Sequence, residues 1–280
     1  MSDAGPVTIL TGAGRGIGRA SALTLASRGH RLVLADNGAT VDGTEPDESV
    51  VREAVEACRA RGARAIGLAD DACAVDGVQA LMRAALDEYG RVDAVVCSAG
   101  TRRDAGLLKL SDAQLDASMH VHLHGPLRLM RAAARHWTDT RAPGRVVLLA
   151  GASAFFGQAR QAAQAASQAA LIALARSAAV ELRRHEIQIN VIVPTARTRL
   201  TRDTPLFKGI GGDSMGPEHV ATLVAFLLSE RGRAVHGEVL GVAGGRIYAI
   251  QSRETTGAFV EGRGFEEAEI AEAWTEITRG

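Results

Sequence analysis

The segment Thr11–Gly18 has the sequence TGAGRGIG and joins a short apolar run to a helical pattern. Glycines at such a turn let the backbone approach a pyrophosphate, whose charge is stabilised by unpaired N–H groups at the start of a helix. The spacing of Gly12, Gly16 and Gly18 is G-x-x-x-G-x-G, which differs from the general dinucleotide pattern G-x-G-x-x-G. Its place between a first strand and a helix favours a nucleotide-binding turn over a merely tight turn.

Two aspartates follow apolar runs further along the chain. Asp36 closes the second run about twenty residues after the turn, where a carboxylate can bind the hydroxyls of an adenosine ribose and repel a 2′-phosphate. This spacing predicts NAD(H) in preference to NADP, and the alternative is an ordinary turn residue beside Asn37-Gly38. Asp71, after the third run, is a candidate contact to the adenine.

Four glutamines follow one another at spacings of three, three and four, namely Gln158, Gln161, Gln164 and Gln168. These spacings place them along one side of a helix predicted over 158–184. A glutamine offers an amide donor and a carbonyl acceptor but no proton that titrates near neutral pH, so it can orient a ligand without acting as a general acid. The row is expected to hydrogen-bond a cofactor ribose or a partner helix, or to form a polar stripe facing solvent or a dimer partner.

Three histidines lie close together in the sequence MHVHLHG. On a helix His120 and His124 would share a face at i and i+4, the geometry of a metal pair, while His122 would point elsewhere. No carboxylate or cysteine motif adjoins them in the sequence, so packing or surface histidines are expected and no metal site is predicted. His122 alone is a candidate acid, because the pKa of histidine lies near the pH at which proteins work.

The remaining pattern supplies the elements that hold these residues. Apolar runs alternate with helical periodicity, and the runs lie at 7–10, 31–36, 63–70, 92–100, 144–151, 187–194 and 237–245. The helical segments between them lie near 16–28, 47–61, 76–89, 112–137, 158–184 and 217–229. This alternation predicts a single Rossmann-type α/β domain, a doubly wound parallel sheet of about seven strands with helices on both faces.

The two ends of the pattern suggest a domain and an extension. The Rossmann-type domain is predicted over 1–245, with residues 199–216 as a lid, because they follow the carboxyl end of a strand, where an open α/β sheet places its substrate loop. Residues 246–280 are predicted to form a C-terminal extension that packs on the domain or on a neighbouring subunit. Its last part, FEEAEIAEAWTEI, has apolar residues at helical spacing.

Composition and charge exclude several classes of protein. The chain has 280 residues, of which 32 are basic and 32 acidic, and no basic cluster with interleaved aromatics, so nucleic-acid binding is not expected. No apolar run has the length of a membrane span, and the N-terminus MSDAGP lacks a signal pattern. Cys58, Cys73 and Cys97 are odd in number and lack C-x-x-C spacing, which suits reduced thiols. A cytoplasmic protein without membrane attachment is predicted.

Several segments together resemble the short-chain dehydrogenase/reductase superfamily over roughly residues 5–250. TGAGRGIG is similar to its T-G-x-x-x-G-x-G, CSAG at 97–100 looks like its N-N-A-G, and PTARTRLT at 194–201 resembles the segment after its sixth strand. The loop after Asp36 and the extension beyond Gly245 look like a subgroup related to hydroxyacyl-CoA and hydroxysteroid dehydrogenases. The resemblance implies an NAD-type cofactor held by Thr11, Gly12, Arg15, Gly16, Ile17, Gly18, Asp36, Asp71, Ala99, Gly100 and Thr198.

The family's catalytic residues are not found at the matching positions. The resemblance implies a serine at the end of the fifth strand, a Tyr-x-x-x-Lys on the next helix and an asparagine on the preceding helix. These positions fall on Gly151, Gln164, Gln168 and His122. No tyrosine or lysine occurs between Lys109 and Lys208, so no shift of the alignment restores the pair.

Three functions remain open on this basis. The first is a protein that keeps an NAD-type pocket without the family's hydride-transfer chemistry and serves as an auxiliary subunit of an active homologue, or as a binding or sensing module. The second is an oxidoreductase of a ketone, hydroxyacyl or steroid-like substrate that uses His122, or an acid on the substrate, in place of the family's tyrosine. The third is a non-redox cyclase, aldolase or dehydratase. The resemblance also implies a homodimer or homotetramer formed through the helices at 112–137 and 158–184, and the small-molecule substrate is unknown.

Overall fold

Short runs of aliphatic and β-branched residues form the strands of one sheet. The computed structural model describes residues 5–207 and 214–279. The strands lie in the order β3-β2-β1-β4-β5-β6-β7-β8. Their bounds are β1 (Val7–Thr11), β2 (Arg31–Ala35), β3 (Ala65–Leu68), β4 (Ala94–Cys97), β5 (Gly144–Leu149), β6 (Ile187–Thr195), β7 (Val239–Ala243) and β8 (Arg246–Ala249). The order reverses between β1 and β4, so the crevice at their carboxyl ends is the place where such a sheet binds ligands.

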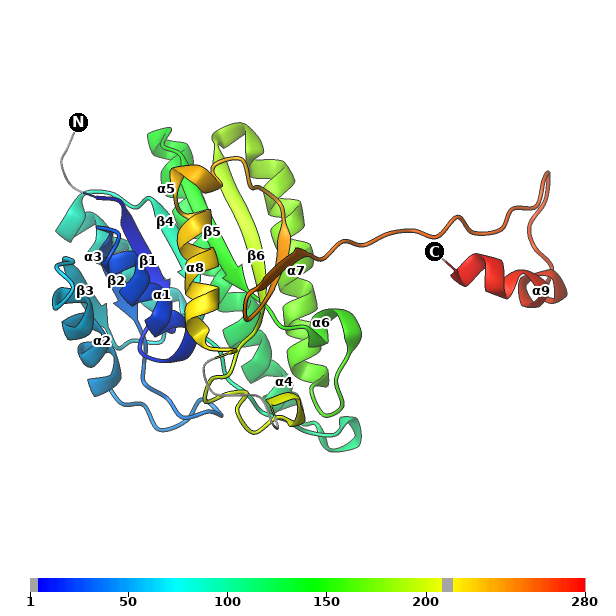
Figure 1. The fold of residues 1–280 in the computed structure, drawn as a ribbon, viewed down its shortest axis with the longest axis horizontal. Coiled ribbons are helices and arrows are strands. Elements are labelled where there is room, and N and C mark those ends of the chain that lie inside the picture. The colour runs from blue at the N-terminus through cyan, green and yellow to red at the C-terminus, as the bar shows by residue number, and fades with distance from the viewer. Residues whose placement is uncertain (1–4, 208–213, 280) are drawn as a thin grey trace. The chain divides into compact units, whose positions relative to one another are not determined.

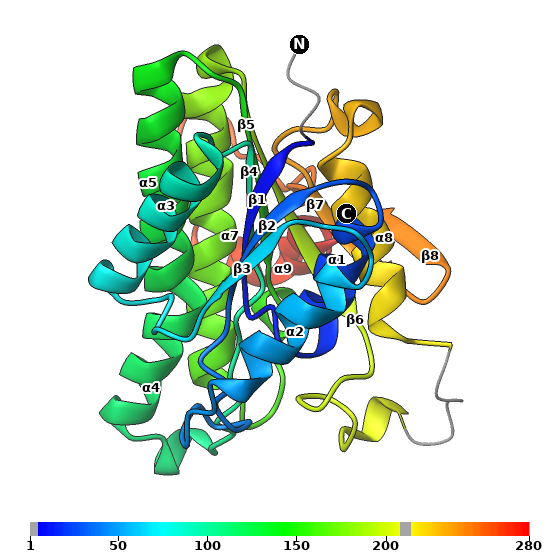
Figure 2. The same ribbon diagram turned by 90° about the vertical axis from the view of Figure 1, so that its left-hand side faces the viewer.

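Helices cover both faces of this sheet, as Figure 1 and Figure 2 show. One layer contains α1 (Gly16–Ala26), α2 (Ser49–Arg59) and α8 (Pro217–Leu227). The other contains α3 (Val75–Tyr89), α5 (Gly125–Thr140) and α7 (Ala162–Leu182). The predicted doubly wound α/β fold is therefore confirmed.

The last strand was not predicted. β1 to β7 pair in parallel, whereas β8 pairs with β7 in an antiparallel sense at the edge of the sheet. Three of its four residues are exposed, so β8 lacks the continuous apolar run that marks a buried strand. The sheet has eight strands rather than about seven, and the first compact unit runs to Ala249, four residues beyond the predicted limit at 245.

The helix predicted over 112–137 is divided into three parts. A first helix, α4 (Asp112–Met119), begins with the expected capping box of Ser111 and Gln114. A π-helical turn, η2 (His120–His124), follows and leads directly into α5. The wider turn of a π-helix changes which side chains share a face, and such turns are frequent at functional sites. It places His122 in the interior while His124 stays exposed.

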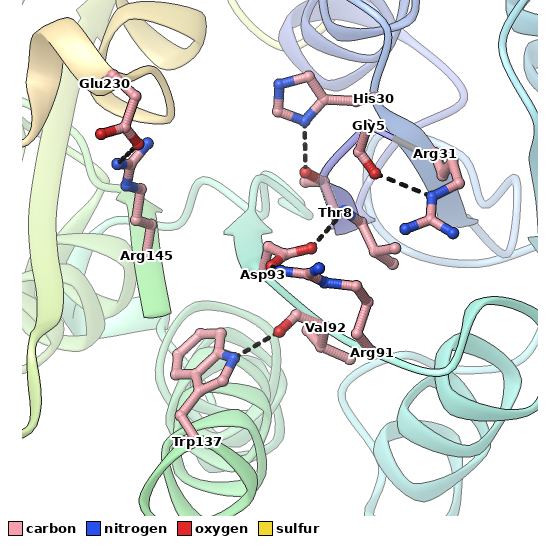
Figure 3. Close-up of polar contacts among 11 residues, drawn as sticks. Gly5, Thr8, His30, Arg31, Arg91, Val92, Asp93, Trp137, Arg145 and Glu230 are labelled. Carbon is pink, nitrogen blue, oxygen red and sulfur yellow. Dashed lines mark hydrogen bonds and ion pairs between the residues drawn. The ribbon is translucent and has the colours of Figure 1, made fainter. Parts of the chain in front are cut away.

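Polar contacts stabilise the sheet at the amino-terminal ends of its strands, as drawn in Figure 3. The Nδ1 atom of His30 lies 2.9 Å from the hydroxyl of Thr8, and both side chains are buried. The indole N–H of Trp137 donates to the carbonyl oxygen of Val92 over 2.7 Å. Asp93 accepts the N–H that begins β1 at 2.7 Å. These contacts lie at the opposite ends of the strands from the ligand crevice, so they stabilise the sheet without entering it.

The second compact unit is Ile250–Gly280 and contains the helix α9 (Glu267–Thr278), as the periodicity of its sequence predicts. Part of the predicted lid at 199–216, residues 208–213, lies outside the described residues. The described part of this segment includes a short 3-10 helix, η4 (Pro205–Phe207). Among the described helices, none has the length and apolar character needed to cross a membrane.

Candidate functional site

The glycine-rich turn runs from the end of β1 into α1 and depends on the absence of side chains. Gly12 and Gly16 have φ angles of +66° and +53°, in the left-handed region that favours glycine. A Cβ on Gly12 would lie 2.6 Å from the backbone of Ala99, and one on Gly18 would lie 1.9 Å from the carbonyl oxygen of Gly12. Glycine is therefore required both for the turn and for the close packing of α1 against it.

The first turn of α1 offers N–H groups for an anion. Arg15 precedes the helix in an extended conformation, and it makes no side-chain capping hydrogen bond in the described structure. The first turn also contains no acidic residue. Since the N–H groups of a first helical turn have no partner within the helix, this end of α1 suits a phosphate or pyrophosphate.

Asp36 fastens the turn to the loop that follows β2. One carboxylate oxygen accepts the N–H of Gly14 and the other accepts the N–H of Gly38, each at 2.8 Å. A carboxylate has about four lone-pair sites, so the same group can still accept hydrogen bonds from ribose hydroxyls. The Arg15 guanidinium donates to the carbonyl oxygens of Gly38 and Ala39, both at 3.1 Å, and completes this side of the site.

A cleft of about 480 Å³ opens beside the turn and brings the predicted cofactor residues together. Its walls include Gly12, Arg15, Gly16, Ile17, Gly18, Asp36, Asp71, Ala99, Gly100 and Thr198. Thr11 lies beneath this surface, where its carbonyl oxygen accepts the hydroxyl of Ser98 at 2.5 Å and joins β1 to β4. The cleft has the size of a small-molecule site, and the turn and the free helix end fit the pyrophosphate of a dinucleotide.

Further residues that the sequence did not predict as cofactor contacts also line the cleft, among them Cys73, Thr101, His120 and Arg199. Burial lowers the pKa of Arg199, and the nearby Arg15 guanidinium lowers it further. The Nε2 atom of His120 lies 2.8 Å from a carboxylate oxygen of Asp71, although 49 residues separate them in the chain. No local sequence motif predicts this pair, because it forms only where the loop after β3 packs beside the π-helical turn.

A second cluster contains three of the four positions that correspond to the family's catalytic residues. The Nε2 atom of Gln168 lies 3.4 Å from Nδ1 of His122. A Cβ on Gly151 would lie 2.6 Å from the Oε1 atom of Gln168. The carboxamide of Gln168 thus fills the space that a side chain at position 151 would need.

The hydrogen bonds of His122 define its protonation. Its Nε2 atom lies 3.0 Å from the carbonyl oxygen of Thr101, which can only accept, so Nε2 carries the proton. The Nδ1 atom then accepts from the amide of Gln168. Burial lowers the pKa of His122, and the contact with Thr101 raises it by less. Both ring nitrogens of a neutral imidazole are engaged, which leaves His122 without a free nitrogen for a substrate.

The predicted row of glutamines is interrupted. The helix begins at Ala162 rather than at 158, so Gln158 lies in the preceding turn and is exposed, while Gln161 and Gln168 are buried. A single polar stripe facing solvent or a dimer partner is therefore not formed. The side-chain carbonyl oxygens of Gln164 and Gln168 are buried and lack a hydrogen-bond partner within 5–207 and 214–279. Buried acceptors of this kind carry a desolvation cost unless a ligand or water supplies a donor.

Comparisons with known proteins agree with this architecture. A family model for short chain dehydrogenase matches residues 6–206. A short-chain type dehydrogenase/reductase of Mycobacterium tuberculosis is 35% identical over 97% of this chain and 93% of its own length. Hydroxyacyl-CoA dehydrogenase ChsB1 of the same organism is 35% identical over 88% of this chain and 80% of its own length.

A solved structure extends the likeness to three dimensions. The crystal structure of a short chain dehydrogenase from Mycobacterium avium superposes with a TM-score of 0.86 at 31% identity, and the match covers 99% of this chain and 97% of that one. Both the family model and these relatives span most of the sheet and the cleft described above. The chain therefore belongs to the short-chain dehydrogenase/reductase family and has hydroxyacyl-CoA dehydrogenases among its relatives.

Proposed function

We propose that this protein binds NAD(H) in the cleft beside the glycine-rich turn. The free N–H groups at the start of α1 would bind the pyrophosphate, and Asp36 would accept the adenosine ribose hydroxyls. The Asp36 carboxylate also opposes a 2′-phosphate, so NADP(H) is expected to bind more weakly. Thr198 and the Ala99-Gly100 segment would contact the nicotinamide half. The cofactor, when bound, would supply the hydride chemistry typical of the family.

We further propose that the site has lost the family's tyrosine-lysine mechanism. The observation that carries this proposal is the contact of Gln168 with His122. Gln168 stands at the position of the family's lysine, and its carboxamide fills the space that a serine side chain at position 151 would need. Neither Gln164 nor Gln168 has a proton that titrates near neutral pH. Loss of a positioned general acid alone lowers a rate by about 10²–10⁴-fold. The protein would then be an auxiliary subunit of an active family member, or a binding or sensing module.

A turnover assay tests this second proposal. NADH consumption would be followed with a 3-oxoacyl-CoA substrate, chosen because hydroxyacyl-CoA dehydrogenases are among the relatives. Hydroxyacyl-CoA dehydrogenase ChsB1 of Mycobacterium tuberculosis, assayed in parallel, is the positive control. We expect the wild-type chain to stay at the rate of the enzyme-free mixture, and sustained NADH consumption above that rate would overturn the proposal.

The names of the relatives favour a second candidate, an NAD-dependent oxidoreductase of a hydroxyacyl-CoA-type substrate. Such an enzyme would need another proton donor, and His122 would take this role only if substrate binding moved the Gln168 amide away from its Nδ1 atom. If turnover is found, His122→Ala should abolish it and His124→Ala, an exposed neighbour in the same turn, should not. An unchanged rate in His122→Ala would remove this histidine from the mechanism.

We propose that the protein assembles as a homodimer or homotetramer, or with an active family member, and acts in the cytoplasm. The exposed side of α7 carries small residues that permit close helix approach, and Val180 on that helix is 81% exposed. Trp274 in α9 is 59% exposed, which suits a helix covered by another chain. Analytical ultracentrifugation tests this, because a single species with the mass of one chain at all concentrations would contradict self-association.

A further inference from the structure

Three different metal-binding groups meet at the rim of the nucleotide cleft. A carboxylate oxygen of Asp71, Sγ of Cys73 and a ring nitrogen of His120 all lie within 4.8 Å of one another. Asp71 and Cys73 belong to the loop after β3, and His120 begins the π-helical turn η2. All three residues line the cleft. The sequence offers no metal-binding motif here, because the donors are joined only by the fold.

The loop after β3 holds the first two donors in place. The Oδ1 atom of Asp71 accepts the backbone N–H of Cys73 at 2.9 Å, which leaves Oδ2 directed toward His120. The Arg128 guanidinium donates to the carbonyl oxygen of Cys73 at 2.6 Å. Cys73 is only 5% exposed, and a Cβ on Gly125 would lie 2.5 Å from its sulfur, so the thiol is seated against the start of α5.

We propose that Asp71, Cys73 and His120 bind one Zn²⁺ ion, with a fourth position open to the nucleotide cleft. Thiolate sulfur, imidazole nitrogen and carboxylate oxygen are the ligands that zinc takes in proteins, and three protein ligands with one open position is a recurrent zinc geometry. Nitrogen and oxygen ligands at about 2.0–2.1 Å from zinc would lie about 3.3 Å apart. The Nε2 to Oδ2 distance of 2.8 Å must therefore open by about half an ångström.

Binding requires one proton to leave. The Cys73 thiol is buried beside the Asp71 carboxylate, so the free protein holds the proton on sulfur. When Zn²⁺ binds, the S–H bond breaks, a bond from sulfur to zinc forms and the proton passes to solvent. In the free protein the Nε2 atom of His120 donates its proton to Asp71, so this proton must pass through solvent to Nδ1 before the Nε2 lone pair binds zinc. No oxidation or reduction takes place.

The proposed metal and the proposed dinucleotide would use the same carboxylate. Asp71 is the expected adenine contact, and its Oδ2 atom is also the ligand oxygen nearest to His120. This part of the inference rests on the proposed NAD(H) site. It predicts that Zn²⁺ and NADH weaken each other's binding, as any two ligands that require one group must do.

Cobalt titration of the full-length reduced protein is the first test. Co²⁺ bound to a thiolate gives a sulfur-to-metal charge-transfer absorption in the near ultraviolet, and excess Zn²⁺ should remove it. We expect the band with wild-type protein, its loss in Cys73→Ser, and affinity more than about tenfold weaker in His120→Ala and Asp71→Asn. Cys97→Ser, which changes a buried thiol outside the cluster, should keep the band. The proposal is overturned if the wild type gives no band or if Cys73→Ser keeps it.

Fluorescence titration with NADH, with and without saturating Zn²⁺, tests the competition separately. The apparent Kd for NADH should rise when Zn²⁺ is present in the wild type and stay constant in Cys73→Ser. Equal NADH affinity in wild-type protein with and without Zn²⁺ would refute the competition. The two proposals can fail independently, because a cobalt band without NADH binding removes only the NAD(H) site, and NADH binding without a cobalt band removes only the metal site.

Discussion

Protonation of His30 is expected to make the protein lose stability as the solution becomes mildly acidic. Burial lowers the pKa of this side chain from its ordinary value of 6.5 to about 4, and Arg28 and Arg145 add to the decrease while Asp93 opposes it. His30 is 7% exposed, and its Nδ1 atom is engaged with Thr8 (Figure 3). The folded protein therefore holds this imidazole neutral under conditions in which the unfolded chain binds a proton.

The sign and size of the effect follow from this difference. Because the folded pKa is the lower one, the unfolded chain binds more protons between about pH 6.5 and pH 4, and the free energy of unfolding falls as pH falls through this window. Integration between about pH 7 and about pH 5 gives a loss of about 2 kcal/mol from His30 alone. Above about pH 7 the His30 imidazole is neutral in both the folded and the unfolded protein, so it no longer contributes to the pH dependence of stability.

Urea unfolding at the two pH values measures this contribution. The variant His30→Gln loses the imidazole contact with Thr8 and should be less stable at about pH 7, but its stability should fall by about 2 kcal/mol less than that of the wild type on going to about pH 5. His124→Gln, which changes an exposed histidine, should keep the full wild-type decrease. If wild type and His30→Gln lose the same free energy between the two pH values, the reasoning about this buried imidazole is wrong.

Three further substitutions test the packing of the site and its support. Gly18→Ala places a Cβ 1.9 Å from a backbone oxygen, so it should cost about 1–3 kcal/mol or more in urea unfolding and abolish NADH binding, whereas Gly106→Ala, with open space around it, should do neither. Gly151→Ser should displace the Gln168 carboxamide and cost about 0.5–1.5 kcal/mol, and this cost should disappear in a Gln168→Ala background; equal costs in both backgrounds would contradict the contact. Trp137→Phe leaves the buried carbonyl oxygen of Val92 without its donor and should lower the free energy of unfolding by about 1–3 kcal/mol. A decrease below a few tenths of a kcal/mol would show that this hydrogen bond is unimportant.

Most strands and helices could be predicted because buried segments have a characteristic pattern of apolar residues in the sequence. Runs such as VTIL and RLVLA are buried on both faces of a parallel sheet and read as continuous apolar segments. Strand β8 escaped this rule because it is an exposed antiparallel edge. The π-helical turn also escaped, since the sequence HVHLH contains no glycine or proline to mark it.

The sequence predicted which residues meet beside the glycine-rich turn, but not the side-chain contacts around them. The glycine-rich turn and Asp36 lie near the ends of consecutive strands, and parallel strands bring their carboxyl ends to one edge. The contact of Asp71 with His120 and the insertion of Gln168 beneath Gly151 depend instead on which side chains meet across elements distant in sequence. His122, which the sequence suggested as a replacement acid, has both ring nitrogens engaged by residues far from it in the chain, Thr101 and Gln168.

A fluorescence titration with NADH tests the central claim, that this chain retains a dinucleotide site, most directly. We predict saturable binding of NADH, weaker binding of NADPH, and loss of binding in Gly16→Val. Valine at this position would have to adopt a left-handed backbone conformation and would place its side chain beside Thr198. Asp36→Arg should reverse the preference toward NADPH. Absence of saturable binding by either nucleotide to folded wild-type protein would contradict the account and leave the glycine-rich turn as a purely structural element.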